Sequence, residues 1–325
     1  MPRTAIDNII DLMNKYGAEK EPFIFIIDFD MKTPEIHKMN SVPPGIKFMT
    51  PLISNVYPGQ IYIKPVSLKK YPVPFSIYTE AFRNVQKNIR LGNSYLLNLT
   101  FPTLIETDLT LEEIFNVSVA KYKLLYYNSF VVFSPEIFVR IKEGEIKSFP
   151  MKGTIDSSVA DAESVLLNDE KEEAEHNTIV DLIRNDLSKV ADNVAVTRYR
   201  YIDRIRSGDS ELLQVSSEIS GRLSKGYANN LGDIIAGLIP AGSVTGAPKK
   251  ETIRIIKESE NSERGWYTGI FGVFDGTSLD SSVMIRFIEK ESDKYLFKSG
   301  GGITCLSDPV KEYEELISKV YVPVG

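Results

Sequence analysis

The chain of 325 residues contains one cysteine, Cys305, and two histidines, His37 and His176. One cysteine cannot form a disulfide within the chain, and these three side chains are too few for a zinc site built from cysteine and histidine. A metal ion bound by this protein must therefore be held by oxygen atoms.

Long apolar stretches are also absent, and the sequence has no dense basic stretch beyond residues 198–206. No run approaches the roughly 18 uninterrupted apolar residues of a membrane helix, and the first residues lack the apolar core of a signal peptide. The net charge of −6 argues against an extended surface for nucleic-acid phosphates. We therefore expect a cytoplasmic protein with no nucleic-acid partner and no membrane partner.

The hydrophobic pattern that is present predicts an α+β fold. Apolar residues at helical spacing predict a first helix that ends at Gly17, and residues 163–190 are expected to be mostly helical and very acidic at the start. Short strand-like segments are grouped as antiparallel neighbours, at 122–133, 136–149, 194–202, 212–223, 266–274 and 279–288. Grouped antiparallel strands with interspersed long helices indicate α+β rather than a parallel sheet.

A proline-rich region precedes the main body of the chain. Seven prolines lie between Ser41 and Pro74, and only residues 60–64 alternate like a strand there. We therefore place a soft boundary near residues 71–74.

A glycine-rich segment, residues 239–258, predicts a loop that opens onto a helix. Gly242 and Gly246 permit unusual backbone angles, Ser243 and Thr245 carry hydroxyl groups, and Pro248 suits a first helical turn. Such an opening presents free backbone N–H groups to a carboxylate or phosphate, and the next residues, Lys249 and Lys250, add positive charge. The spacing does not fit a nucleotide-binding P-loop. The simpler alternative is a glycine-rich turn that caps an ordinary helix.

Two pairs of glutamates could hold a divalent cation. Glu172 and Glu175 stand three residues apart on one expected helix, and Glu312 and Glu315 do so on another. Facing one another, the pairs would offer several hard oxygen ligands to Mg²⁺. The alternative for each pair is a solvated helix face.

Lys152 and Glu136 are candidates for catalysis. Lys152 follows a strand and precedes a glycine; it becomes a nucleophile if burial or a nearby cation lowers its pKa, and is otherwise a lysine of an exposed turn. Glu136 follows a proline between strands and could act as a general acid if an apolar pocket raises its pKa. The alternative for Glu136 is a solvated loop position.

Arg286 interrupts an otherwise apolar segment, residues 282–288, that is expected to be a strand. A buried guanidinium needs a carboxylate, which either a ligand or an internal salt bridge can supply. Residues 299–302 are expected to form a sharp glycine turn that allows close approach of a ligand.

In combination these segments resemble the chorismate-utilising enzymes, and among them the branch of aminodeoxychorismate synthase component I, which is related to anthranilate synthase component I. The matching motifs occur in the family order over residues 76–322: Ser134–Glu136, Pro150–Thr154, Ala174–His176, Ile179–Leu187, Gly242–Lys249, Tyr267–Gly269, Ile285–Arg286, Gly300–Ile303 and Glu312–Glu315. The resemblance implies a two-layer antiparallel β core, a β-sandwich flanked by helices. It further implies that residues 1–75 are an abbreviated N-terminal region contributing strands to the core, and that 76–322 form the chorismate-binding catalytic domain.

The resemblance also implies a reaction, in which chorismate and ammonia give 4-amino-4-deoxychorismate on the route to p-aminobenzoate and folate. Mg²⁺ would hold the ring carboxylate, with Glu175 and Glu315 as closest ligands and Glu172 and Glu312 in support. The enolpyruvyl carboxylate would meet Arg286, and the other substrate-binding residues would be Ser243, Thr245, Gly246, Tyr267, Gly301 and Gly302. Glu136 would protonate the departing hydroxyl, and Lys152 would add to C2 of the ring before ammonia enters at C4.

Three positions separate this chain from its relatives. Resembling anthranilate synthases usually carry alanine where Lys152 stands. Isochorismate and salicylate synthases activate water with a lysine at the position of Leu96, and leucine cannot act as a base. The family's usual glutamine falls at Leu96 and its usual histidine at Gln214, so neither residue is assigned a role.

The ammonia is expected from a separate glutamine amidotransferase subunit, because Cys305 has no clear histidine partner in the sequence. Two alternatives stay open. The chain could be an anthranilate synthase component I, which releases pyruvate and makes an aromatic product, or a non-catalytic chorismate-binding subunit that regulates an amidotransferase.

Overall fold

The computed structural model describes residues 3–56, 66–207 and 210–324. The expected strand at residues 60–64 lies outside these ranges. No helix within them is both long enough and apolar enough to span a membrane.

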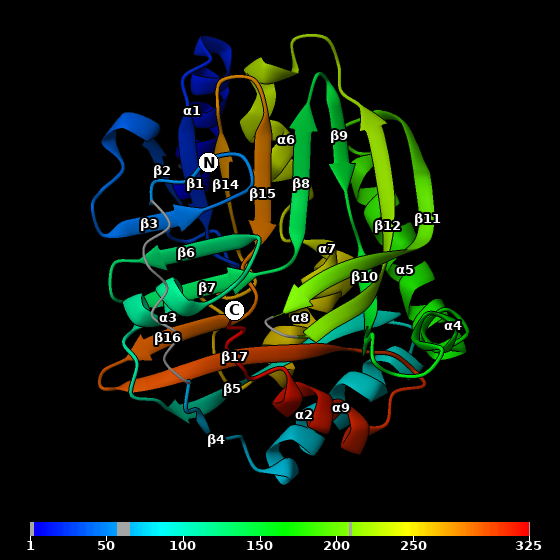
Figure 1. Ribbon diagram of the computed structural model, residues 1–325. Helices are drawn as coiled ribbons and strands as arrows, with labels where there is room; N and C mark the ends of the chain where they lie inside the picture. The colour runs from blue at the N-terminus through cyan, green and yellow to red at the C-terminus, as the bar shows by residue number, and fades with distance from the viewer. Residues whose placement is uncertain (1–2, 57–65, 208–209, 325) are drawn as a thin grey trace.

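Two antiparallel sheets dominate the described residues (Figure 1). The first has the strand order β10 (Met151–Asp156), β12 (Ser210–Arg222), β9 (Glu145–Ser148), β8 (Ile137–Lys142), β15 (Leu279–Val283), β14 (Ile270–Phe274), β1 (Phe23–Ile27) and β2 (Glu35–Lys38), and β11 (Asp192–Ser207) pairs with β12. The second has the order β13 (Gly246–Ala247), β5 (Leu96–Glu106), β17 (Lys294–Ile303), β16 (Phe287–Glu291), β7 (Phe130–Ser134), β6 (Tyr122–Tyr126) and β3 (Ile46–Met49), and β4 (Lys69–Tyr71) pairs with β5.

Helices flank both sheets. Near the first sheet lie α1 (Ala5–Glu19), α4 (Ala162–Leu167), α5 (Glu170–Leu187) and α6 (Leu231–Leu238); near the second lie α2 (Phe75–Arg90), α3 (Leu111–Val117), α8 (Lys249–Ser259) and α9 (Pro309–Ser318); the short α7 (Gly242–Thr245) precedes β13. The predicted α+β fold, with antiparallel sheets flanked by helices, is confirmed.

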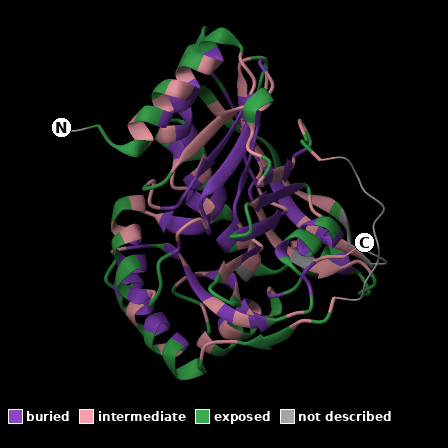
Figure 2. Cartoon of the chain, turned by 90° about the vertical axis from the view of Figure 1, so that its left-hand side faces the viewer, coloured by how far each residue is buried: buried purple, intermediate pink, exposed green. Residues whose placement is uncertain are grey.

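The strand β1 shows how the two layers are held together. All five of its residues are buried, and they alternate between two hydrophobic cores. Phe23, Phe25 and Ile27 pack in the core that includes residues of α1 and α6, whereas Ile24 and Ile26 pack in the core that includes residues of β3, β6 and β7. Figure 2 accordingly shows buried residues gathered in the central strands and exposed residues on the outer sides of the helices.

The period of two also decides which residues of β5 face the functional site. Leu97, Leu99 and Phe101 pack in a core with apolar residues of α2, α8 and α9. Leu96 and Asn98 point the other way and line the large pocket described below. One strand thus anchors the helical layer with one face and shapes the pocket with the other.

The strands that precede residue 76 belong to the same sheets as those that follow it. The strand β1 pairs with β14, and β3 pairs with β6. The division of the chain at residue 75 into two units stays a prediction.

One expectation about helices was wrong. The first helix continues past Gly17 to Glu19, and Lys20 takes the left-handed conformation at its end. A Cβ at Gly17 would lie 2.0 Å from the carbonyl oxygen of Ala228, so this glycine allows close approach rather than a cap.

The expectation that residues 163–190 are mostly helical is confirmed. They form two helices, because the chain breaks at Asn168 and Asp169 caps α5 by accepting from the N–H of Glu172.

Lys123 of β6 supplies a pH-sensitive contribution to stability. Its side chain is buried, and its Nζ donates to the carbonyl oxygens of Phe115 at 2.6 Å and Ser118 at 3.0 Å, at the end of α3. Burial lowers its pKa from 10.5 to about 8.

We predict that Lys123 makes the free energy of unfolding rise between pH 8 and 10.5. In that window the unfolded lysine keeps its proton while the folded one has released it, so the unfolded state binds more protons. Relative to Lys123→Met, the free energy of unfolding of the wild type should rise by about 3 kcal/mol between pH 8 and 10.5. Urea unfolding of both proteins at several pH values measures this, and parallel pH profiles would contradict it.

Candidate active site

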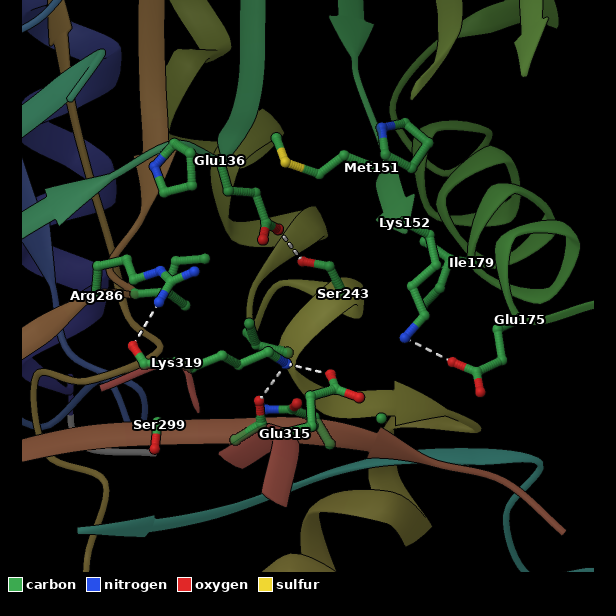
Figure 3. Close-up of a pocket in the computed structure, with 18 of the residues that line it drawn as sticks. Glu136, Met151, Lys152, Glu175, Ile179, Ser243, Arg286, Ser299, Glu315 and Lys319 are labelled. Atoms are coloured by element: carbon green, nitrogen blue, oxygen red, sulfur yellow. Dashed lines mark hydrogen bonds and ion pairs between the residues drawn. The ribbon is translucent and has the colours of Figure 1, made fainter. Parts of the chain in front are cut away.

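A pocket of about 550 Å³ lies between the two sheets and the helices α5, α7 and α9. Figure 3 shows side chains from these elements converging on it. The structure brings nearly all the predicted site residues to this pocket: Glu136, Lys152, Glu172, Glu175, Ser243, Thr245, Gly246, Tyr267, Arg286, Gly301, Gly302 and Glu315. Glu312 is the exception, because its side chain is not among those that line the pocket.

Residues 299–302 belong to the strand β17, so the sharp turn expected at these residues was wrong. Gly300, Gly301 and Gly302 pair with Thr100, Leu99 and Asn98 in the ladder between β17 and β5. A Cβ at Gly301 would lie 3.5 Å from Oε2 of Glu312 and 3.9 Å from Oε1 of Glu315. The missing side chain therefore leaves the strand backbone open to the pocket directly beside two carboxylates.

Lys152 lies on β10 and points into the pocket. Its Nζ lies 2.6 Å from Oε2 of Glu175, and its side chain is 23% exposed. Burial by itself lowers the pKa of Lys152, but the charges of Glu175 and Glu172 act in the opposite direction and leave its pKa above the ordinary value. The condition for a nucleophilic lysine, a lowered pKa, is therefore not met in this state, and the alternative of an exposed turn lysine is wrong.

Two of the glutamates share one turn of α5. Glu175 is almost fully buried, and Oε2 of Glu172 has no hydrogen-bond partner among the described residues. Burial raises the pKa of Glu172, and the charge of Lys152 opposes this shift. A buried oxygen without a donor is an open ligand position for a cation.

Glu315 approaches the pocket from α9, across from α5 (Figure 3). No three acidic, histidine or cysteine side chains in the described ranges are already gathered with metal-binding geometry. The carboxylate chemistry of Glu172, Glu175 and Glu315 and the unpartnered Oε2 of Glu172 nevertheless fit a hard cation such as Mg²⁺. The magnesium site therefore stays a prediction whose donor set is compatible with the pocket.

Glu136 follows β7 and lines the same pocket. The hydroxyl of Ser243 donates a hydrogen bond to its Oε1. Burial raises the pKa of Glu136, and this outweighs the hydrogen bond from Ser243 and the charge of Lys319, which both lower it. The pocket thus favours the protonated acid at this position.

Arg286 occupies a break between strands, which corrects its expected place within one. The strand β15 ends at Val283, β16 begins at Phe287, and Arg286 takes a left-handed φ of 53°. Its guanidinium donates to the carbonyl oxygen of Lys319 and lies over the ring of Tyr321, with 4.4 Å from Cζ to the ring centroid. No carboxylate partner of Arg286 occurs among the described residues, so the internal salt bridge is not formed there.

The glycine-rich segment folds as one helical turn, α7, followed by β13. Gly246 has a φ of 128°, and a Cβ there would lie 1.8 Å from the carbonyl oxygen of Leu96. The hydroxyl of Thr245 donates to the carbonyl oxygen of Ala241 at 2.8 Å. This turn therefore brings the backbone against β5 at the pocket wall, as only glycine permits.

The two lysines after this turn do not face an anion site in the pocket, contrary to expectation. Nζ of Lys249 lies 2.7 Å from Oδ2 of Asp186 and donates to the carbonyl oxygen of Leu238. Lys250 is exposed and lies outside the pocket lining. Lys249 therefore ties α8 to Asp186 of α5.

Lys319 is a pocket residue that the sequence reasoning missed. Its Nζ lies 2.7 Å from Oε1 of Glu315 and donates to the carbonyl oxygen of Gly300 at 2.8 Å. The available signal was its position four residues after Glu315, on the same side of α9.

Leu96 and Gln214 also line the pocket. Leu96 is almost fully buried, so it gives this part of the wall an apolar surface.

The fold is shared with solved anthranilate and isochorismate synthases. The anthranilate synthase component I of Streptococcus pneumoniae superposes with a TM-score of 0.64 and 25% identity, covering 79% of this chain and 59% of that one. MenF, the menaquinone-specific isochorismate synthase of Escherichia coli, superposes with a TM-score of 0.71 and 15% identity, covering 98% of this chain and 82% of that one.

The sequence comparison identifies the family. The model of the chorismate binding enzymes matches residues 64–324, and the chain belongs to this family. A PabA-like protein of Haemophilus influenzae, described as uncharacterized, is 48% identical over 100% of this chain and 99% of its own length. Anthranilate synthase component 1 1 of Haloarcula marismortui is 35% identical over 74% of this chain and 51% of its own length. Aminodeoxychorismate synthase component 1 of Bacillus subtilis is 29% identical over 80% of this chain and 57% of its own length. The chain thus spans about half the length of the last two relatives.

We predict that Mg²⁺ raises the melting temperature of the wild-type protein and that Glu172→Gln removes most of this gain. At a hundredfold excess over its dissociation constant, a ligand that binds only the folded state adds about 2.7 kcal/mol. Thermal unfolding with and without MgCl₂ measures the shift. Glu80→Gln, an exposed change outside the pocket, should respond like the wild type. Equal shifts in the wild type and Glu172→Gln would contradict the assignment.

Proposed function

We propose that this chain is an aminodeoxychorismate synthase component I, which converts chorismate and ammonia to 4-amino-4-deoxychorismate for p-aminobenzoate and folate synthesis. The observation that carries the proposal is the amine of Lys152, which lies in the pocket 2.6 Å from Glu175. A relative named aminodeoxychorismate synthase component 1 lends support.

Anthranilate synthase component I is the second candidate, favoured by the 35% identity to a relative of that name. It ranks second because enzymes of that type resembling this chain usually have alanine in place of Lys152, which here fills part of the pocket. The two reactions differ in outcome, since anthranilate formation releases pyruvate.

The chemistry of chorismate matches the two ends of the pocket. Chorismate is a small dianion with a ring carboxylate and an enolpyruvyl carboxylate. Arg286 would bind the enolpyruvyl carboxylate beside Tyr267 and the open backbone of Gly301 and Gly302, all of which line the pocket. Ser243, Thr245 and Gly246 would complete this side, with Lys319 as an additional cation.

Glu175 and Glu315, supported by Glu172 and by Glu312, would hold Mg²⁺ at the ring carboxylate. When bound, the ion would neutralise the carboxylates and make the ring a better electron acceptor.

Lys152 and Glu136 would carry out the replacement of the ring hydroxyl at C4 by ammonia. Nζ of Lys152, having lost its proton to water, forms a bond to C2; the ring double bonds shift and the bond from C4 to the hydroxyl breaks. Glu136 gives its proton to this hydroxyl, which leaves as water. Ammonia then forms a bond to C4, the double bonds shift back and the bond from C2 to Lys152 breaks, which restores the lysine.

Leu96 favours ammonia over water as the second nucleophile. Its buried side chain presents no group that can remove a proton from water. Hydration of the ring is therefore disfavoured.

We predict that Lys152→Ala lowers the rate of 4-amino-4-deoxychorismate formation by at least about a hundredfold, because the attacking amine is lost. The measurement is mass spectrometry of products from chorismate, Mg²⁺ and an ammonium salt. The control is Lys250→Ala, an exposed change outside the pocket, which should keep the wild-type rate.

Full synthesis by Lys152→Ala would refute the covalent role of this lysine. Pyruvate with an aromatic product from the wild type would favour anthranilate synthase. Unchanged chorismate would favour the non-catalytic regulatory subunit.

We also predict that kcat at a fixed concentration of free ammonia falls as the pH rises through the raised pKa of Glu136, since the acid must be protonated. Glu136→Gln should lower kcat by about 10²–10⁴ and abolish this limb of the pH profile. Ser243→Ala should move the limb to higher pH, because the hydrogen bond from Ser243 lowers that pKa. A limb unchanged in Glu136→Gln would show that another group titrates.

A further inference from the structure

A second hollow, of about 600 Å³, lies outside the active-site pocket, between α2 and the segment that joins β17 to α9. Both helices lie at the lower end of the molecule in Figure 1. We call this hollow the α2 groove; its lining includes Phe82, Arg83, Lys87, Arg90, Leu91 and Cys305. Nothing in the proposed reaction uses these side chains.

The α2 groove carries three cations on one helix face. Arg83, Lys87 and Arg90 are exposed and are spaced by four and three residues, so they lie side by side. None of the three has a carboxylate partner among the described residues. On the neighbouring helix α8, by contrast, Arg254 is paired with both Glu251 and Glu258.

The row belongs to a chain that is acidic overall. The net charge of the chain is −6, so acidic side chains are plentiful, and like charges three and four residues apart destabilise a helix. Lys87 and Arg90 lie in the last turn of α2, where the helix dipole favours positive charge, but none of the three cations is paired with a carboxylate of the described residues. The row therefore suits carboxylates brought by another molecule.

Exposed apolar side chains accompany the cations. Leu91, which lines the groove, is 66% exposed, and Leu306, in the segment after β17, is 71% exposed. Phe82 lies buried at the base of the groove. Apolar anchors beside arginines are the composition of a protein interface rather than of a site for a small ion.

The α2 groove adjoins the strands that form the pocket. Residues 91–95 lead into β5, whose first residue, Leu96, lines the pocket. Residues 304–308 follow β17, whose Gly300, Gly301 and Gly302 line it too, and Leu97 pairs with Ile303 between these two strand ends. A protein seated in the groove would contact the ends of both strands.

The proposed reaction needs ammonia, which the described part of this chain is not built to release from glutamine. Cys305 is exposed in the α2 groove, whereas His37 is bonded to Glu35 and His176 is buried against Ser217. A thiol without a histidine partner lacks the base that activates it.

We propose that the α2 groove is the docking surface for the ammonia-supplying glutamine amidotransferase subunit, which would present carboxylates around an apolar side chain. This inference rests on the proposed function. Each carboxylate would pair with Arg83, Lys87 or Arg90, and the apolar side chain would lie against Leu91 and Leu306.

The test is the triple variant Arg83→Glu/Lys87→Glu/Arg90→Glu, compared with the wild type in two assays. With chorismate, Mg²⁺ and an ammonium salt, the variant should match the wild type. With glutamine and the amidotransferase subunit of the same organism, the rate of the variant should be about tenfold or more below that of the wild type, because three attractive charge pairs become repulsive. The single change Leu306→Asp should weaken the glutamine-dependent rate in the same selective way.

The matched control is Lys15→Glu/Lys142→Glu/Lys225→Glu, which changes the net charge equally at exposed lysines outside the groove. It should keep both rates. An equal glutamine-dependent loss in this control, a loss of both rates in the groove variant, or full glutamine-dependent activity in the groove variant would each overturn the docking surface.

Failure of the proposed function has a different signature. If the wild type makes no 4-amino-4-deoxychorismate even with ammonium, the reaction is wrong, and docking is then measured directly by calorimetric titration with the amidotransferase subunit. Wild-type binding that the groove variant loses and the control keeps would support the surface. No binding by the wild type, or equal binding by all three proteins, would refute it.

Discussion

The site depends on how the negative charge of one pocket is compensated. Glu172, Glu175 and Glu315 face the same cavity, and such carboxylates repel one another when nothing lies between them. In the structure Lys152 compensates Glu175 at 2.6 Å, and Lys319 compensates Glu315 at 2.7 Å. Removing one partner of the more deeply buried pair, Lys152 and Glu175, would leave an uncompensated charge and cost about 3–5 kcal/mol. The amine of Lys152 is thus placed by the same carboxylates that we propose as ligands of Mg²⁺.

The two sheets explain how residues far apart in the sequence reach one cavity. Lys152 comes from the first sheet, Gly301 from the second, and Glu175 and Glu315 from helices that pack on either side. The alternating burial of β1 and β5 fixes the separation of these layers, because each strand packs apolar side chains on one face against a separate core. The pocket lies where these layers meet, because many positions there carry polar side chains or glycines instead of large apolar side chains.

Much of this arrangement could be predicted from the sequence. The antiparallel strands and the hairpin β14–β15 follow from hydrophobic alternation and turn residues, which are local properties. The ordered motifs identified the residues that converge on the pocket, although spacing alone left Glu172 and Glu175 indistinguishable from a solvated helix face.

The misjudged details depend on tertiary contacts. Residues 299–302 look like a turn because glycines favour turns, but their missing side chains serve a close approach between β17 and β5. The left-handed φ of Arg286 cannot be read from an apolar run. The direction of the pKa shift of Lys152 depends on Glu175, and the sequence does not show that this carboxylate lies beside it and raises its pKa.

The most direct measurement of the central claim is intact-protein mass spectrometry of the wild type incubated with chorismate and Mg²⁺ in the absence of ammonia. If the amine of Lys152 attacks the ring while the hydroxyl leaves, the protein gains the mass of chorismate minus one water, and peptide mapping places this mass on Lys152. Addition of an ammonium salt should then discharge the adduct as 4-amino-4-deoxychorismate. An adduct on another residue, or efficient synthesis through a protein that never carries one, would contradict the account.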